Sequence, residues 1–310
     1  MLKPIAFDVV TFMTQLFEYY LYTVFTFFTE AEDFTVAAAQ LPRDGKLVQC
    51  LTRVHNSIIL REGDVEEGMK VLPSHLSPMV DLDSDSHLYG FTHRLIGVES
   101  LVFLSKQLKL VYHKLELWIP VNKQAFLGQF YAQTVDIVAE VRGPVYKAIT
   151  DATIDYGGIL QSMSSVKWDI KDIRSDHSDY VSAIVREYKN LQIKVRSFAS
   201  LVPLPAESLA EFWRNVVTRT SRVFVEGFSN VKKCSTAGRA LMLLDYQNFA
   251  MKIEDIARLK PIPARMYVVD YINAFYMQVP VRVNILDKNH YFFLNPNFWN
   301  SPFFTGFPGW

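Results

Sequence analysis

Cysteine is scarce in this chain. Its 310 residues include two cysteines, Cys50 and Cys234, which lie far apart and outside any metal-ligand spacing. A disulfide-stapled secreted domain needs a denser, paired set of cysteines. The sequence also contains no Asn-x-Ser/Thr acceptor for glycosylation. These absences favour a reducing, cytoplasmic setting and predict no metal site.

An excess of charge of one sign is also lacking. Lysine and arginine number 32, aspartate and glutamate number 32, and the formal net charge is zero. A balanced chain has no overall electrostatic attraction to nucleic acid or to an anionic membrane. We therefore expect no nucleic-acid partner. Half of the residues are hydrophobic and 14% are aromatic, which is enough for a sizeable core.

Motifs for covalent chemistry are absent. Neither G-x-x-x-x-G-K-[ST], G-x-G-x-x-G nor G-x-S-x-G occurs. The acidic run 81–86 resembles the start of a calcium-binding loop, but Ser86 and Thr92 stand where that loop needs Gly and Glu. We interpret the run as the N-terminal cap of a helix. The sequence predicts no enzyme and no cofactor.

Histidine and cysteine offer no alternative site. His87, His93 and His113 lack the spacing of three or four residues that zinc ligands on one helix need, so we expect them at the surface or the edge of the core. Cys234 follows two lysines, which would lower its pKa if it were exposed. We interpret it instead as a buried helical cysteine.

The apolar segment 5–28 is long enough to span a membrane. However, Asp8 and Glu18 would lie within the bilayer, where each acid costs roughly 2.5–3.5 kcal/mol. The segment also lacks the short apolar core and cleavage site of a signal peptide. We favour a helix buried in the core of a soluble domain, with a membrane span and a signal peptide as the alternatives. The predicted buried face of this helix consists of Phe7, Val10, Phe17, Leu21, Val24 and Phe28.

Helical periodicity dominates up to Val279, and no convincing strand pattern precedes that residue. We therefore predict an all-α fold, an elongated multi-helix bundle. Residues 31–85 are expected to be partly loop or disordered. The predicted helices cover residues 5–30, 47–60, 87–118, 123–155 with a bend or split at Gly143-Pro144, about 181–198, 207–225, 229–259 and 264–277.

Two predicted helices carry clear apolar stripes with alternating spacing of three and four residues. In the helix 87–118 the predicted seam consists of Leu101, Leu104, Leu108, Val111, Leu115 and Trp118. In the helix that Pro203 ends, the stripe consists of Val181, Ile184, Tyr188, Leu191, Val195 and Phe198.

A basic region lies near the C-terminal third of the chain. We consider it a candidate surface for anionic lipid headgroups or an acidic partner, with a solvated helix face as the alternative. Its residues are Arg214, Arg219, Arg222, Lys232, Lys233 and Arg239.

One long string carries a family resemblance. Residues 224–256, FVEGFSNVKKCSTAGRALMLLDYQNFAMKIEDI, resemble the C-terminal domain of the syndetin family, and the likeness continues to Met277. Residues 5–28 and 89–118 also resemble this domain. We therefore assign residues 1–278 to one syndetin-like helical domain. We expect the family's N-terminal coiled-coil region to lie outside this chain.

The resemblance implies a function that periodicity does not. Syndetin is a subunit of the endosome-associated recycling protein (EARP) complex, a multisubunit tether of stacked helical bundles acting in endocytic recycling and retrograde traffic. It implies a non-enzymatic scaffold that contacts other EARP subunits, SNAREs or small GTPases. It also implies peripheral membrane association at recycling endosomes and the trans-Golgi network. The alternative is a peripheral membrane-binding domain that acts through residues 214–239.

The last segment, 279–310, departs from this pattern. It contains nine aromatic residues and three formal charges in 32 residues. One interpretation is a functional aromatic tail for membrane insertion or docking. We favour instead a genuine isoform end from alternative splicing or a gene-model artefact, in either of which the family's last helices are lost. We predict that the segment is irregular.

Overall fold

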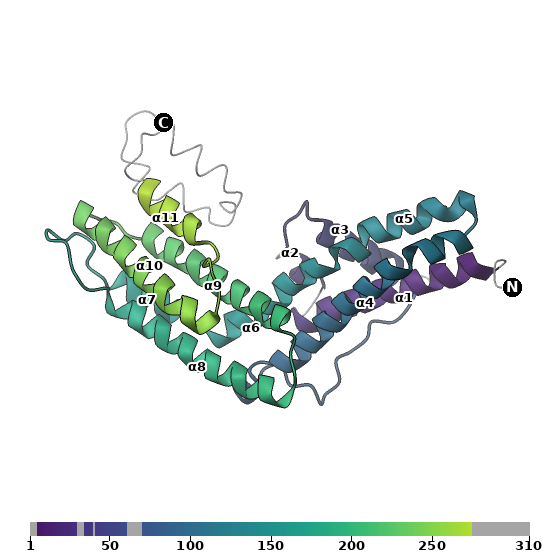
Figure 1. The fold of residues 1–310 in the computed structure, drawn as a ribbon, viewed down its shortest axis with the longest axis horizontal. Coiled ribbons are helices and arrows are strands. Elements are labelled where there is room, and N and C mark those ends of the chain that lie inside the picture. Colours follow the sequence, from purple (N-terminus) through teal and green to yellow (C-terminus); the bar gives the residue numbers. More distant parts are fainter. Residues whose placement is uncertain (1–4, 30–33, 40, 61–69, 275–310) are drawn as a thin grey trace. The chain divides into compact units, whose positions relative to one another are not determined.

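The computed structural model describes residues 5–29, 34–39, 41–60 and 70–274. Backbone contacts divide the chain into two compact units, residues 1–149 and 150–310, and each is described by itself. Helices dominate both units (Figure 1). Within the described ranges, the β-type pairing consists of one isolated parallel bridge between Ile59 and Val71. The predicted all-α class is confirmed.

The first unit packs around α1 and α4. In it, α1 lies against α3 and α4, and the 3-10 segment η4 lies against α3, α4 and α5 (Figure 1). The helix α6 (Arg142–Thr153) contains the boundary between the units. The other elements are α1 (Ala6–Phe28), α2 (Phe34–Ala39), α3 (Lys46–Ser57), η2 (Asp85–His87), α4 (Phe91–Trp118), η3 (Val121–Lys123), α5 (Gln124–Gln133) and η4 (Val135–Val141).

The core face of α1 agrees with the prediction. Five of the six side chains predicted to be buried are buried, namely Val10, Phe17, Leu21, Val24 and Phe28. Phe7 is half-buried and meets Phe126 edge to face, with ring centroids 5.5 Å apart. Within the described ranges, no helix combines the length and the apolar character that a bilayer crossing needs.

The predicted seam of α4 is wrong over most of its length. Leu101 and Leu115 are buried, but Leu104, Val111 and Trp118 are exposed. Apolar residues occur on several faces of this helix, so their spacing alone does not select one face. Packing selects it instead. The ring of Phe28 approaches Gly97, and Tyr20 hydrogen-bonds Ser100 at 2.6 Å, which turns the first half of α4 toward α1.

The acidic run does not cap α4, so that prediction is also wrong. α4 begins after Gly90, which has a left-handed backbone with φ of 66° and makes no side-chain cap. The carboxylate of Asp81 instead accepts the backbone N–H groups of Asp83 at 3.0 Å and Ser84 at 3.1 Å. Asp81 therefore closes a local turn, because a short acidic side chain readily bonds the backbone two residues further on.

The predicted helix 123–155 is split, but not at Gly143-Pro144. α5 ends at Gln133 and the 3-10 segment η4 follows Thr134. Pro144 lies in the first turn of α6. Proline is tolerated there because the N–H groups of a first turn have no partner within the helix.

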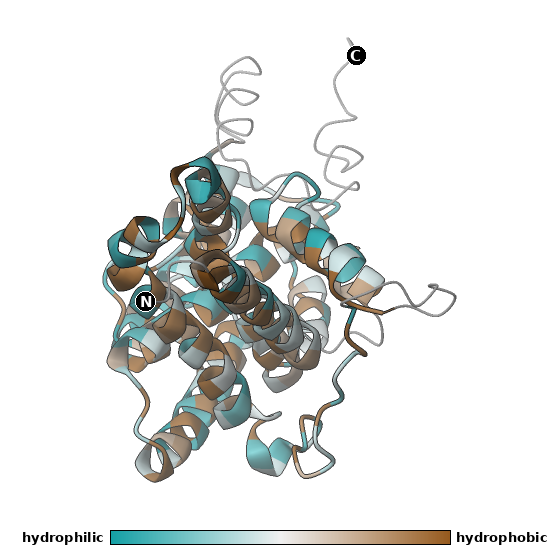
Figure 2. Cartoon of the chain, turned by 90° about the vertical axis from the view of Figure 1, so that its right-hand side faces the viewer, coloured by the Kyte–Doolittle hydropathy of each residue, from teal (hydrophilic) through white to brown (hydrophobic). Residues whose placement is uncertain are grey.

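The second unit is a bundle built on α10. α10 packs against α8, α9 and α11, and α7 packs against α8 and α9 (Figure 1). Figure 2 colours the described residues of the whole chain by hydropathy, and along its helices hydrophobic and hydrophilic residues alternate, as expected of helices with one buried side. The elements are α7 (Tyr156–Ser164), α8 (Asp179–Leu201), α9 (Ala206–Ser229), α10 (Thr236–Ala257) and α11 (Arg265–Asn273).

Apolar stripes on α8 and α9 form much of this core. On α8 the predicted stripe is buried from Val181 to Val195, and Phe198 is half-buried. Phe224 of α9 is fully buried and packs against Tyr246 and Phe249 of α10, with ring centroids 5.3 and 4.9 Å apart. Aromatic pairs of this kind contribute about 0.5–1.5 kcal/mol each beyond the area they bury.

Candidate functional site

The basic region predicted from sequence is largely engaged within the second unit. Arg214 is exposed and forms an ion pair with Glu211. Arg219 donates from Nε to Asp151 at 3.0 Å, and its guanidinium lies 5.1 Å from the centre of the Tyr156 ring. These two arginines therefore already have acidic partners.

The other basic residues divide into two groups. Arg222 and Arg239 are half-buried, whereas Lys232 and Lys233 are exposed in the loop between α9 and α10. The structure therefore presents the two loop lysines to solvent more freely than the arginines. That this basic region is a functional surface remains a prediction.

The two thiols are not activated. Cys50 is buried in α3, and burial raises its pKa, which the charge of Arg53 opposes. Cys234 is half-buried in the loop before α10, so the prediction of a buried helical cysteine is wrong. Burial also raises the pKa of Cys234, and Arg239 opposes that rise. Thiols with raised pKa values keep their protons at neutral pH and are weak nucleophiles.

A polar network in the first unit connects three elements. The guanidinium of Arg53 donates to Glu18 at 2.8 Å and to the hydroxyl of Thr134 at 2.9 Å. Thr134 in turn donates to the same oxygen of Glu18 at 2.9 Å. The three groups satisfy one another, so this network holds α1, α3 and the start of η4 together.

A second network lies between α4 and α6. Arg142 donates from Nε and Nη2 to the two carboxylate oxygens of Glu99, at 2.8 and 2.5 Å. The hydroxyl of Tyr146 donates to Glu99 at 2.6 Å. A bidentate arginine pair of this kind fixes geometry as well as adding energy. Its groups serve packing within residues 1–149.

The described histidines do not assemble a metal site. His87, His93 and His113 are exposed, as predicted. Among the residues that the structure describes, no group of three His, Cys, Asp or Glu side chains could hold a metal ion.

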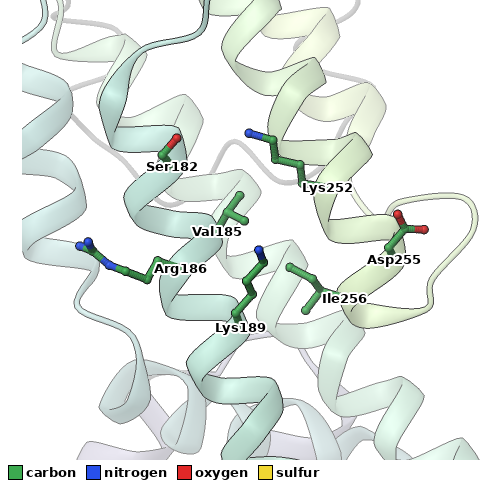
Figure 3. Close-up of a pocket in the computed structure, with 7 residues that line it drawn as sticks. All are labelled: Ser182, Val185, Arg186, Lys189, Lys252, Asp255 and Ile256. Atoms are coloured by element: carbon green, nitrogen blue, oxygen red, sulfur yellow. The ribbon is translucent and has the colours of Figure 1, made fainter.

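A groove between α8 and α10 was not predicted from sequence (Figure 3). Its volume is about 550 Å³. The sequence could have indicated the α8 wall of the groove, because Ser182, Arg186 and Lys189 are four and seven residues apart and such positions share one helix face. Its partners on α10 lie far away in sequence, however. The groove is lined by Ser182, Val185, Arg186, Lys189, Lys252, Asp255 and Ile256.

Hydrogen bonds between α8 and α10 position the walls of this groove. At the start of α8, the N–H of Ser178 donates to Asp245 at 2.7 Å. About three helical turns after Asp245 along α10, the carbonyl of Ile256 accepts a hydrogen bond from the Gln192 side chain of α8. The two helices therefore run in the same direction.

Lys252 is held in place at one end of the groove. Its ammonium donates to Nε2 of His177 at 2.9 Å, while Nδ1 of His177 lies 3.1 Å from the carbonyl oxygen of Ser178. An ammonium is a donor only, so the Nε2 atom accepts in this contact. The imidazole of His177 thus orients Lys252.

The first unit presents an aligned apolar surface on α4. Ile96, Phe103, Leu110 and Leu117, here called the α4 stripe, recur every seven residues and are 49%, 59%, 75% and 77% exposed. A seven-residue repeat follows one line along a helix. Exposed apolar residues are usually scattered singly, so an aligned set is typical of a contact surface. Val9, Phe12 and Leu16 of α1 are also exposed, as is Ile5, which precedes this helix.

These features define the class of protein: an all-α protein whose described helices present an apolar stripe and a groove with cationic residues in its lining. The sequence profile described as "Syndetin, C-terminal" matches residues 88–292. The chain belongs to the syndetin C-terminal family. The match extends beyond Met277, the residue at which we expected the resemblance to end. Residues 279–310 lie outside the described residues. Their nature and the domain boundary at residue 278 therefore stay predictions.

Curated relatives agree with this assignment. Syndetin of Mus musculus is 40% identical over 286 residues, and syndetin of Gallus gallus is 41% identical over the same length. Each alignment covers 89% of this chain and 30% of the relative. The chain therefore spans about 30% of the length of the curated relatives it matches. No solved structure matches it.

Proposed function

We propose that this chain is part of a non-enzymatic subunit of the EARP vesicle-tethering complex, acting in endocytic recycling and retrograde membrane traffic. The observation that carries the proposal is membership of the syndetin C-terminal family, with 40% identity over 89% of the chain. The protein acts on the cytoplasmic side of recycling endosomes and the trans-Golgi network. Its partners are the other EARP subunits, with SNAREs or small GTPases as further contacts.

The α4 stripe supports a scaffold function. We assign to it an amphipathic helix of another subunit, with apolar residues that also recur every seven positions. Lys106 and Lys114 are exposed three or four residues from members of the stripe, so they lie beside it on the helix surface. A partner helix with acidic residues beside its apolar line would complement both the shape and the charge.

Charge introduced into the α4 stripe is expected to disrupt subunit assembly. Leu110→Glu combined with Leu117→Glu should reduce the recovery of the other EARP subunits at least tenfold, because burying one leucine at an interface contributes about 1.5–3 kcal/mol. The measurement is affinity purification of the full-length protein carrying this domain, with each subunit quantified. Because both side chains are already exposed, the melting temperature should not change.

A matched control places the same charges elsewhere. Met79 and Ile173 are 91% and 77% exposed and lie outside α4, so Met79→Glu with Ile173→Glu should leave recovery unchanged. Equal recovery from the stripe variant and the control would reject the stripe as the docking surface. Failure of the unmodified protein to recover any EARP subunit would contradict the proposed function itself.

The alternative function is peripheral membrane binding through the basic region, and the exposure of Lys232 and Lys233 favours it. Each lysine near an anionic surface contributes about 1 kcal/mol of attraction. Lys232→Glu with Lys233→Glu should therefore weaken co-sedimentation with phosphatidylserine vesicles by more than tenfold. Binding that ignores both anionic lipid and salt would exclude this alternative.

A further inference from the structure

We propose that the groove between α8 and α10 binds a small ligand carrying several phosphates, of the inositol polyphosphate class, either free or as the headgroup of a phosphoinositide. The groove is separate from the loop lysines and from the α4 stripe. The proposal goes beyond the tethering function and does not depend on it.

The positive charge of the groove favours the binding of an anion. Arg186, Lys189 and Lys252 line it together with a single acid, Asp255. Among the described residues, neither Arg186 nor Lys189 forms an ion pair, and the ammonium of Lys252 contacts the imidazole of His177 and not a carboxylate. The groove therefore carries three cations against one acid, an excess of two positive charges (three minus one), and a bound anion would relieve the mutual repulsion of these cations.

The arrangement of the donors suits several phosphates rather than one. Figure 3 shows the side chains of Ser182 and Lys252 directed toward each other from α8 and α10. The side chain of Lys189 lies between the two helices, and that of Arg186 lies on the outer side of α8. Ser182 and Lys189 are seven residues apart on one helix, which separates their backbone positions by about 10 Å. Donors whose backbone positions are spread over that length suit phosphates on opposite sides of a ring better than they suit a single phosphate or carboxylate.

The shape of the groove also favours a compact ligand. Its volume of about 550 Å³ is typical of small-molecule sites, which range from about 300 to 1,000 Å³. Val185 and Ile256 provide apolar surface for the carbon face of a ring. The hydrogen bond from Gln192 to Ile256 joins the two helices beside the groove, and this bridge obstructs an extended peptide that would continue along it.

The test is a binding measurement on the full chain with two probes. Inositol hexakisphosphate tests the soluble ligand by calorimetry, and phosphatidylcholine vesicles with or without a phosphoinositide test the headgroup. We expect saturable binding of the soluble probe that weakens as salt is added. Lys189→Glu with Lys252→Glu should reduce its affinity roughly a hundredfold, because each charge-assisted hydrogen bond accounts for about a tenfold change.

Matched variants separate a specific site from general charge. Lys232→Glu with Lys233→Glu makes the same change in net charge outside the groove and should retain binding of the soluble probe. If the reversal at 189 and 252 impairs folding, Lys189→Gln with Lys252→Gln tests the same contacts without adding acids. Vesicle binding in addition to soluble binding identifies a lipid headgroup; soluble binding alone identifies a free ligand.

Two results would overturn the proposal. One is the absence of binding to either probe. The other is an equal loss of binding in the groove variant and in the loop variant, since that would reflect net charge alone. Because the groove variants leave the α4 stripe intact, recovery of EARP subunits should be unchanged in them. Failure of the groove proposal is therefore distinguishable from failure of the tethering proposal.

Discussion

Gly238→Ala is expected to destabilise the second unit by about 3 kcal/mol, the upper end of the usual cost of overpacking. A β-carbon at position 238 would lie 1.8 Å from the carbonyl oxygen of Trp168. That oxygen is a backbone atom which also accepts the N–H of Ser235 at 3.2 Å, so it cannot move aside alone. The loop after α7 would have to separate from the start of α10.

The measurement is urea unfolding followed by circular dichroism. Gly157→Ala is the matched control, because its β-carbon would meet only the Asp155 carboxylate, at an ordinary contact distance of 3.5 Å. Both glycines lie in the first turn of a helix, so the change in helix propensity is similar. If the two variants unfold at the same urea concentration, the close approach of Trp168 to α10 is wrong.

Asp245→Ala is expected to have the second largest effect, roughly 2–3 kcal/mol. Asp245 is fully buried on α10, and its carboxylate accepts the N–H of Ser178, the residue that precedes α8. Alanine would leave that buried N–H unpaired and open a space beside it. Asp245→Asn keeps an acceptor oxygen in the same place, so it should cost clearly less. Equal losses from the two variants would contradict the importance of this hydrogen bond.

The same residue predicts a pH dependence. Burial raises the pKa of Asp245 above its ordinary value of 3.8, although the N–H of Ser178 opposes the rise. The folded state therefore holds this proton to higher pH than the unfolded chain does. The preferential protonation of Asp245 in the folded state adds to the free energy of unfolding. This stabilisation is fully present below the ordinary carboxylate pKa and is lost as the pH rises through the pKa of Asp245 in the folded state.

The Asn variant separates this titration from all others in the protein. Since asparagine does not titrate, the stability of Asp245→Asn relative to the unmodified protein should improve as the pH is raised from below 4 toward neutrality. Urea unfolding of both proteins across this range measures the difference. A difference that is independent of pH would contradict a raised pKa at Asp245.

The helices of the second unit could largely be predicted from sequence. The stripe from Val181 to Val195 is buried, and the helix that carries it ends at Leu201, just before Pro203. Here most apolar residues occupy one face, with Ile193 as an exposed exception, while charged residues occupy the other faces, so periodicity identifies the buried side. α4 could not be predicted in this way, because apolar residues such as Phe103 and Leu110 also occupy its exposed side.

The sequence by itself determined the all-α class and the family. The spacing of apolar residues and the positions of prolines determine where helices form and end through effects on neighbouring residues. The resemblance of residues 224–256 to the family is likewise a property of the sequence alone. Only the tertiary structure decided which face of α4 is left exposed and that Lys189 and Lys252 line one groove. The physical reason is that burial and convergence of charges depend on contacts between segments far apart in the chain, which local periodicity does not encode.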